Sequence, residues 1–288
     1  MATLFAPAKI NLTLEILARR EDGYHTLRSV MVPIGLYDRI ALEPAARASF
    51  RANVPGTGDD NLVLRALAAA GIGHPLRVEL EKAIPIGGGL GGGSSDAAAV
   101  LRAAMEGTFG PPAERDWVEL ARNLGSDVPF FLQGTAALVE GTGERVTALG
   151  ALPSWWVVTV RPPVSVSTAE AYRALDEVRG TATRSRPRAS SASLAAVDAL
   201  QRRDFAALRA TLLNDFHDVV LAQHEPIARA DAALRASGAE AVLLSGSGSC
   251  VFALFENEAE ARASAARFDP AAAAEIFVSP FHHDPGWR

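Results

Sequence analysis

Residues 85–95 have the sequence Pro-Ile-Gly-Gly-Gly-Leu-Gly-Gly-Gly-Ser-Ser, and this stretch decides how the rest of the chain is interpreted. Six of the seven positions from Gly87 to Gly93 are glycine. Glycine has no side chain and adopts positive φ values, so such a loop can wrap closely around a ligand with its N–H groups turned inward. A loop that only had to be flexible would need one or two glycines, because each one costs folding entropy. The loop is therefore a candidate site for an anionic ligand such as a phosphate chain.

The elements on either side of this loop are predicted to be a strand and a helix. Apolar and charged residues alternate over 76–82, which predicts a half-exposed strand. Apolar residues recur at helical spacing over 97–105, so a helix should begin at Ser94 or Ser95 as its N-cap, with Asp96 in its first turn. The N-terminus of a helix carries partial positive charge, which favours a phosphate at the same place.

Two better-known phosphate-binding loops differ from this one. The P-loop ends in Gly-Lys-Ser or Gly-Lys-Thr, whereas Gly93 is followed directly by two serines. Gly87, Gly89 and Gly92 satisfy the GxGxxG spacing of dinucleotide-binding folds. Those folds also need a continuously apolar strand before the loop and an acidic residue after a second strand, about twenty residues later. The alternating strand before this loop and the Gly-Pro-Pro at 110–112 fit neither requirement.

Composition limits the classes of protein to which the chain can belong. Of its 288 residues, 49% are hydrophobic and 21% charged, which is typical of a globular protein with a sizeable core. The formal net charge of −5 disfavours general nucleic-acid binding, which needs a basic excess. Cys250 is the only cysteine, so no intramolecular disulfide can form. The sequence shows neither a secretory signal nor an apolar run of about 20 residues, so we expect a cytoplasmic protein without a membrane span.

Strict alternation near the N-terminus predicts a strand with polar groups on one face. Apolar residues occupy every second position over 10–16, and polar residues fill the positions between them. Because successive side chains of a strand point to opposite faces, the apolar set should face a core, and Lys9 and Asn11 should point the same way on the other face. A Glu-Asp-Gly turn follows, and Tyr24 and His25 come directly after it.

An acidic residue follows a predicted helix in the middle of the chain. Helices are expected over 61–70 and over 116–124, each ending at a glycine. The residue before a proline avoids the helical region, so Pro129 should keep Val128 extended. Asp127 is then expected at a sharp change of chain direction.

The second half of the chain has a different order of elements. The best candidate for a domain boundary is 150–154, which divides the chain into 1–150 and 151–288. Beyond it we expect a strand, helices, two strands, a helix and a last strand. These strands are predicted at 155–160, 241–244, 250–255 and near 276. Residues 180–193 are rich in Ser, Thr, Arg and Ala, which predicts a mobile surface loop.

Several of these segments resemble a known family. Residues 85–98 resemble the signature loop of the superfamily of galactokinase, homoserine kinase, mevalonate kinase and phosphomevalonate kinase. Four further motifs resemble, more narrowly, the 4-diphosphocytidyl-2-C-methyl-D-erythritol kinases: PAKINL at 7–12, DGYH at 22–25, LGSDVPFF at 124–131 and LSGSGSCVF at 244–252. The motifs occur in the expected order. The resemblance covers the chain from residue 7 to about residue 255 and fades over 173–213.

This resemblance implies roles for individual residues. Asp127 matches the catalytic aspartate that orients the substrate hydroxyl and accepts its proton, and Lys9 matches the lysine between that hydroxyl and the γ-phosphate. Taken alone, Lys9 could be an ordinary surface lysine and Asp127 a helix cap. Their occurrence together, beside the glycine loop, favours a catalytic role. On the substrate side the resemblance implies Asn11, Tyr24, His25, Thr168 and Tyr172. Tyr24 and His25 match the positions that receive a cytosine ring: the tyrosine can stack on the base, and the imidazole or nearby backbone can read its edge. Tyr172 would be a second stacking residue. On the ATP side it implies Asn61, Lys82, Pro85, Ile86, Gly87, Gly88, Gly89, Leu90, Gly91, Gly92, Gly93, Ser94 and Ser95.

The fold, the cofactors and the reaction also follow from the resemblance. The fold would be α+β in two lobes: an N-terminal ATP-binding lobe with the glycine-rich loop between strand and helix, and a C-terminal ferredoxin-like lobe, with the active site in the cleft. ATP would donate a phosphate to the 2-hydroxyl of a substrate that carries a cytidine diphosphate group, in non-mevalonate isoprenoid synthesis. Magnesium is expected with ATP; Ser94, Ser95 and Asp96 are the polar side chains nearest the loop, and the sequence names no ligand set.

Two alternatives stay open on the sequence. Another kinase of the superfamily, such as a homoserine kinase, would share the loop but should lack the motifs at 22–25 and 125–129. A non-catalytic nucleotide sensor on the same fold should have lost Lys9 or Asp127, and both are present. We expect a monomer or weak dimer, with neither nucleic-acid nor membrane partners.

Overall fold

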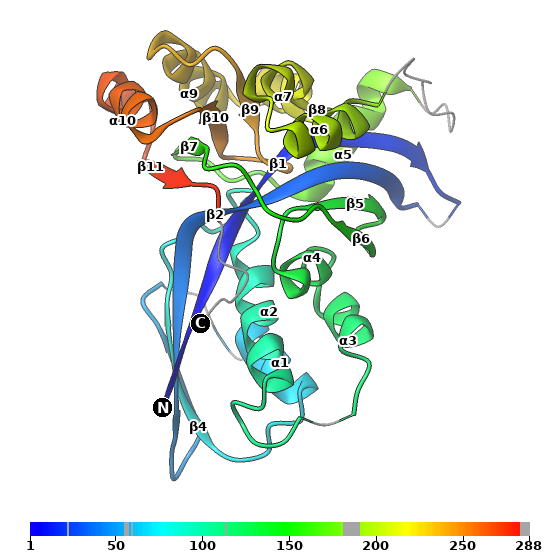
Figure 1. Ribbon diagram of the computed structural model, residues 1–288, viewed down its shortest axis with the longest axis vertical. Helices are drawn as coiled ribbons and strands as arrows, with labels where there is room; N and C mark the ends of the chain where they lie inside the picture. The colour runs from blue at the N-terminus through cyan, green and yellow to red at the C-terminus, as the bar shows by residue number, and fades with distance from the viewer. Residues whose placement is uncertain (22, 55–57, 59, 113, 181–190, 283–288) are drawn as a thin grey trace.

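Two β-sheets divide the computed structural model, which describes residues 1–288 apart from 22, 55–57, 59, 113, 181–190 and 283–288 (Figure 1). A seven-stranded sheet and the helices α1 to α4 form one half, and a four-stranded sheet with the later helices forms the other. The prediction of an α+β fold in two lobes is confirmed.

The larger sheet is built around two long antiparallel strands, β1 (Ala2–Arg19) and β2 (His25–Pro44). Its order is β3-β4-β2-β1-β8, and the hairpin of β5 and β6 pairs with β2. The shorter strands are β3 (Ser49–Ala52), β4 (Leu76–Glu81), β5 (Ala137–Gly141), β6 (Arg145–Ala148) and β8 (Leu213–Asn214). Figure 1 shows β1 and β2 running from one half of the molecule into the other, so residues along them can serve both halves.

The two faces of β1 are both buried. On the apolar face Ile10 and Leu12 are 0% exposed, while on the polar face Lys9 is 3% and Asn11 1% exposed. Strand β4 instead has the predicted half-exposed pattern, in which every second residue is exposed. Buried polar groups need partners, so the polar face of β1 must be satisfied from inside the molecule.

Four helices lie beside this sheet. They are α1 (Leu62–Ala69), α2 (Gly92–Met105), α3 (Trp117–Leu124) and α4 (Val128–Gln133). The helices predicted over 61–70 and 116–124 are confirmed as α1 and α3, and the side chains of Asn61 and Asp116 cap their N-termini.

The predicted start of α2 was wrong. The helix begins at Gly92, and its N-cap is Gly91 with φ of 73°, a left-handed conformation that a glycine adopts without a steric cost. Ser94 and Ser95 therefore lie inside the helix, and Asp96 lies beyond the first turn. The last glycines of the loop form the first turn of the helix, so the N-cap position is occupied by Gly91 and not by a serine.

The predicted extended conformation of Val128 was also wrong. Val128 is the first residue of α4, and Pro129 lies in the first turn. Proline is tolerated there because the N–H that it lacks would have no partner inside the helix. Asp127 still marks the change of direction, as the N-cap residue between α3 and α4.

The smaller sheet contains the four strands predicted for the second half. It is antiparallel with the order β11-β7-β10-β9, the arrangement of a ferredoxin-like lobe. The strands are β7 (Trp156–Arg161), β9 (Val242–Leu244), β10 (Val251–Phe255) and β11 (Glu275–Pro280). The helices of this half are α5 (Thr168–Arg179), α6 (Ala192–Arg202), α7 (Phe205–Thr211), α8 (His217–Gln223), α9 (Glu225–Ala236), α10 (Glu258–Arg267) and the short 3-10 helix η1 (Pro270–Ala272).

Strand β1 also joins the two halves. β8 pairs with it in parallel. The carboxylate of Glu15 accepts hydrogen bonds from Ser191 Oγ at 2.7 Å and from the backbone N of Ser193 at 3.1 Å, at the start of α6. A buried carboxylate at a helix N-terminus is stabilised by the helix dipole, so these bonds fix α6 on the sheet.

Most of the loop predicted over 180–193 cannot be checked: Gly180 and Ser191 lie between the helices α5 and α6, as predicted. Residues 181–190 lie outside the described residues, and residues 192 and 193 belong to α6. The division of the chain at 150–154 stays a prediction. Within the described ranges, none of the helices combines the length and the apolar character needed to cross a bilayer.

Candidate active site

Two cavities meet at the glycine loop. The larger has a volume of about 960 Å³ and the smaller about 710 Å³. Gly89 and Gly91 line both cavities, so the loop forms the wall between them. Lys9 and Asp127 line the larger cavity next to these two glycines. A ligand in one cavity can therefore reach a ligand in the other beside a lysine and an aspartate.

The ammonium group of Lys9 is held at this junction. Its Nζ donates hydrogen bonds to Asn11 Oδ1 at 2.6 Å and to the carbonyl oxygen of Gly89 at 2.8 Å. Asp127 Oδ2 lies 3.9 Å from the same nitrogen. Burial lowers the pKa of Lys9, and the negative charge of Asp127 opposes that shift. The sequence correctly placed Lys9 and Asn11 on one face, and the bond between them shows why that matters.

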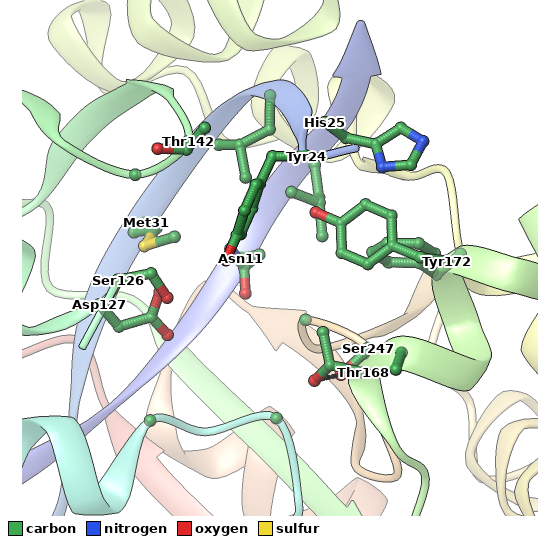
Figure 2. A pocket seen from close by; sticks show the side chains of 18 of the residues that line it. Asn11, Tyr24, His25, Met31, Ser126, Asp127, Thr142, Thr168, Tyr172 and Ser247 are labelled. Carbon is green, nitrogen blue, oxygen red and sulfur yellow. Dashed lines mark hydrogen bonds between the residues drawn. The ribbon is translucent and has the colours of Figure 1, made fainter. Parts of the chain in front are cut away.

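The carboxylate of Asp127 is not used by its own helix. Asp127 is the N-cap residue of α4, but its side chain makes no capping hydrogen bond. Its side chain is 28% exposed, and Figure 2 shows it beside Ser126, across the cavity from Tyr172. A carboxylate that faces both a cavity and a cation is placed to accept a proton from a bound ligand.

The glycine loop turns its carbonyl groups toward the protein. Four successive carbonyl oxygens accept hydrogen bonds: Gly87 from Ser249 N at 3.3 Å, Gly88 from Cys250 N at 3.1 Å, Gly89 from Ser245 Oγ at 3.0 Å and Leu90 from Lys9 N at 2.9 Å. Gly89 has φ of 73°, and a Cβ there would collide with the carbonyl oxygen of Ser245. All four bonds use carbonyl groups of the loop. They leave its N–H groups for an anionic ligand in the smaller cavity.

Behind the loop, two aspartates share one lysine. Lys82 Nζ donates to Asp96 Oδ2 at 2.7 Å and to Asp38 Oδ2. Asp38 Oδ1 accepts from the backbone N–H groups of Ala83 and Ile84, at 2.7 and 2.9 Å. Burial raises the pKa of Asp96 to about 7, although the charge of Lys82 opposes the shift. This ion cluster joins the end of β4 to the start of α2 and so fixes the two ends of the loop.

The residues predicted on the ATP side gather around the smaller cavity. Asn61, Lys82 and all of 85–94 line it. Ser95 does not, because it is 0% exposed on the inner side of α2. Asn61 Oδ1 accepts a hydrogen bond from Val63 N at 2.9 Å, so the amide nitrogen of Asn61 is the group that can donate to a ligand in this cavity.

The residues predicted on the substrate side all line the larger cavity. They are Asn11, Tyr24, His25, Thr168 and Tyr172. Figure 2 shows His25 and Tyr172 at one end of the cavity, Asp127 at the other and the Tyr24 ring between them. Thr168 comes from the start of α5 and shares a hydrogen bond of 2.9 Å with Ser247. The cavity thus has an aromatic end and a charged end.

Two residues that shape the larger cavity were missed by the sequence analysis. Asp176 Oδ1 lies 2.9 Å from His25 Nε2. Asn214 Nδ2 donates to the carbonyl oxygens of Leu244, the last residue of β9, and Gly246, at 2.7 and 2.8 Å, and so holds the turn that follows β9. A signal existed for Asp176, which follows Tyr172 by four residues and so shares its helix face. No pattern marked Asn214, which lies just beyond the region where the resemblance fades.

The described part of the chain provides no preformed metal centre at these cavities. Among the residues that the structure describes, no group of three or more His, Cys, Asp or Glu side chains could hold a metal ion. Two buried oxygen atoms near the loop, Ser95 Oγ and Asp96 Oδ1, have no hydrogen-bond partner within the same residues.

Two segments of the chain match the two domains of one protein family. Residues 61–135 match the GHMP kinases N terminal domain, and residues 196–272 match the GHMP kinases C terminal domain. The two segments make up more than half of the 288 residues. The chain belongs to the GHMP kinase family. The first segment contains the glycine loop and Asp127, and the second contains the turn that packs against the loop.

Two relatives with high sequence identity show which group within the GHMP kinase family the chain resembles. The chain is 42% identical over 251 residues to the 4-diphosphocytidyl-2-C-methyl-D-erythritol kinase of Symbiobacterium thermophilum, which covers 85% of this chain and 87% of that protein. A crystal structure of a 4-(cytidine 5'-diphospho)-2C-methyl-D-erythritol kinase is 37% identical and superposes with a TM-score of 0.80 over 98% of this chain and 100% of that chain. The narrower resemblance seen in the sequence is confirmed.

A less similar solved structure shares the fold. The homoserine kinase of Cytophaga hutchinsonii superposes with a TM-score of 0.70 over 98% of this chain and 95% of that chain, at 19% identity. At this identity the similarity shows a common fold and carries no information about the substrate.

Proposed function

We propose that this GHMP kinase transfers the γ-phosphate of ATP to the 2-hydroxyl of 4-diphosphocytidyl-2-C-methyl-D-erythritol, a step in non-mevalonate isoprenoid precursor synthesis. The observation that carries the proposal is the junction of the two cavities at Gly89 and Gly91, with Lys9 and Asp127 beside it. The backbone wall of the smaller cavity suits the phosphates of ATP. The aromatic end of the larger cavity suits a nucleobase, and the name of the 42% identical relative supports cytosine.

In this reaction the substrate hydroxyl lies between Lys9 and Asp127. Its oxygen forms a bond to the γ-phosphorus, the bond from that phosphorus to the bridging oxygen of ADP breaks, and Asp127 accepts the hydroxyl proton. Lys9 offsets the negative charge that develops on the transferred group. Because Asn11 and the Gly89 carbonyl already hold Lys9, its charge needs no reorganisation when the ligands arrive.

ATP occupies the smaller cavity in this proposal. Its phosphates lie on the N–H groups of 87–93 at the start of α2, and Asn61 and Lys82 lie toward the adenine. Mg²⁺ is expected with ATP and supplies charge neutralisation on the phosphates. Ser94 and Asp96 line this cavity and offer the hard oxygen ligands that Mg²⁺ prefers, and Asp96 Oδ1 has no hydrogen-bond partner among the described residues.

The cytidine diphosphate group occupies the larger cavity. Its cytosine stacks at the aromatic end, on Tyr24 and Tyr172, while the methylerythritol reaches Asn11 and Asp127. Binding energy from the distant base can position the reacting hydroxyl. The two-lobe division at residue 150, the cytoplasmic location and the monomeric or weakly dimeric state belong to the same proposal.

A phosphate-transfer assay against a panel of alcohols tests the proposal. ADP release would be measured with 4-diphosphocytidyl-2-C-methyl-D-erythritol, with methylerythritol phosphate lacking the cytidyl group, with homoserine and with mevalonate. We expect efficient turnover of the cytidyl compound alone. Comparable kcat/KM for homoserine would favour the other kinase branch, and binding of ATP without turnover of any alcohol would favour a nucleotide sensor.

A further inference from the structure

The contact between His25 and Asp176 is not used in the reaction described above. Asp176 Oδ1 lies 2.9 Å from His25 Nε2, and the His25 side chain is only 9% exposed. The other carboxylate oxygen of Asp176 lies 3.8 Å from an Arg19 guanidinium nitrogen. An ionised carboxylate can only accept hydrogen bonds.

This contact decides which nitrogen of His25 carries the proton. Because Asp176 accepts, Nε2 must be the donor. In a neutral imidazole the second nitrogen, Nδ1, is then an acceptor. The hydrogen bonds of His25 to described side chains involve Nε2 alone, so Nδ1 is available to a ligand in the larger cavity, which His25 lines.

The stacking of His25 on Tyr172 fixes the plane in which such a ligand would lie. The two ring centroids are 4.7 Å apart, and the rings are tilted by 20°. Phe216 packs edge-on behind Tyr172 at 4.8 Å and holds its ring in place. A flat base that hydrogen-bonds to the edge of His25 lies near the imidazole plane, and therefore nearly parallel to the Tyr172 ring. One geometry thus satisfies both edge recognition and stacking.

We propose that Asp176 is a positioning residue that sets the base specificity of the larger cavity. It holds His25 with an unprotonated Nδ1, which accepts a hydrogen bond from the exocyclic amino group of cytosine. Uracil carries a carbonyl oxygen at that position, so two acceptors would face each other. The inference rests on the proposed function, because it assumes a pyrimidine at the aromatic end.

The first test needs no substrate. Nitrogen-15 NMR of the histidine-labelled protein, near neutral pH, distinguishes protonated from unprotonated ring nitrogens. For His25 we expect an unprotonated Nδ1 and a protonated Nε2 in the wild type, and a mixture of the two tautomers in Asp176→Ala. A protonated Nδ1 in the wild type would overturn the proposal, because His25 could not then accept from the amino group.

The second test measures discrimination between bases. The ratio of kcat/KM for the cytidyl substrate to that for its uridyl analogue should fall about tenfold in Asp176→Ala, the usual scale for one hydrogen bond. The loss should appear in KM for the nucleotide alcohol, with KM for ATP unchanged. Glu177→Ala is the matched control, since Glu177 is an exposed acid on the same helix, and it should keep the wild-type ratio.

The two tests separate failure of this inference from failure of the proposed function. An unchanged base ratio in a folded Asp176→Ala variant, with the cytidyl compound still phosphorylated, would overturn the role of Asp176 and leave the function intact. If the cytidyl compound were not a substrate at all, the proposed function would fall, and the base specificity would fall with it even if NMR found the expected tautomer.

Discussion

The ATP-side and substrate-side cavities share two glycines but are built from different parts of the chain. The smaller cavity is bounded mainly by one continuous segment, 85–94, whose backbone faces the ligand. The larger cavity is bounded mainly by residues from β1, β2, α5, the segment 122–129, the β5–β6 turn and the turn after β9. A ligand held by backbone N–H groups leaves a contiguous sequence signature. A ligand held by side chains leaves single residues spread over the chain. Substitutions that affect one cavity should therefore change the affinity for its own ligand only, and substitutions at the shared wall should change both.

The largest effect should come from the junction that serves both cavities. Asp127→Asn keeps the shape of the side chain but removes the proton acceptor, so kcat should fall by at least ~100-fold. KM for ATP and for the cytidyl substrate should change little, because neither cavity loses its walls. Steady-state kinetics measures both. Asp116→Asn, at the exposed N-cap of α3, is the control and should be nearly silent, since asparagine caps a helix as well as aspartate.

The next effect should be confined to the larger cavity. Tyr24→Ala should lose roughly 1–3 kcal/mol of cytidyl-substrate binding, the range for a base stacked on an aromatic ring. Tyr24→Phe keeps the ring and should bind almost normally. Calorimetric titration gives both affinities, and ATP affinity should stay unchanged in each variant. Equal substrate affinity for Tyr24→Ala and the wild type would remove Tyr24 from the base site.

A smaller effect should reach both cavities through the wall that they share. Gly89→Ala must hold a side chain in a left-handed conformation, at a cost of roughly 1–2 kcal/mol, and must move the loop away from Ser245. Affinity for ATP and for the cytidyl substrate should both weaken. Gly73→Ala is the control, because its added Cβ would meet no atom within 4 Å and the residue lines neither cavity. Normal ATP affinity in a folded Gly89→Ala protein would place the phosphates elsewhere.

The smallest effect concerns the buried ion cluster, which belongs to the smaller cavity alone. The pKa of Asp96 is raised from 3.8 to about 7, so between these values the folded protein keeps a proton that the unfolded chain releases. The free energy of unfolding of the wild type should therefore fall, relative to that of Asp96→Asn, as the pH rises from near 4 to near 7. Urea unfolding of both proteins across this range measures the difference. A wild-type free energy of unfolding that rises with pH relative to that of Asp96→Asn would contradict the raised pKa.

The contrast between the cavities also explains what the sequence could predict. The glycine loop and the shared face of Lys9 and Asn11 follow from local rules, because backbone freedom and strand period act within a few residues. Asp176 and Asn214 escaped because their partners come from other elements, which only the folded chain brings together. The errors at Ser94, Ser95 and Val128 have a local cause. Serine was expected at the N-cap of α2, but the helix begins earlier, after Gly91. Val128 was expected to be extended before a proline, but Pro129 lies in the first turn of α4 and allows Val128 to begin the helix.

The position of the transferred phosphate tests the central claim most directly. Purified protein would be incubated with ATP, Mg²⁺ and 4-diphosphocytidyl-2-C-methyl-D-erythritol, and the product would be followed by phosphorus-31 NMR. We expect one new phosphate monoester on the tertiary carbon of the methylerythritol, an intact cytidyl diphosphate and one ADP for each ester formed. A phosphate on any other oxygen, or ADP release without a new ester, would contradict the placement of the 2-hydroxyl between Lys9 and Asp127.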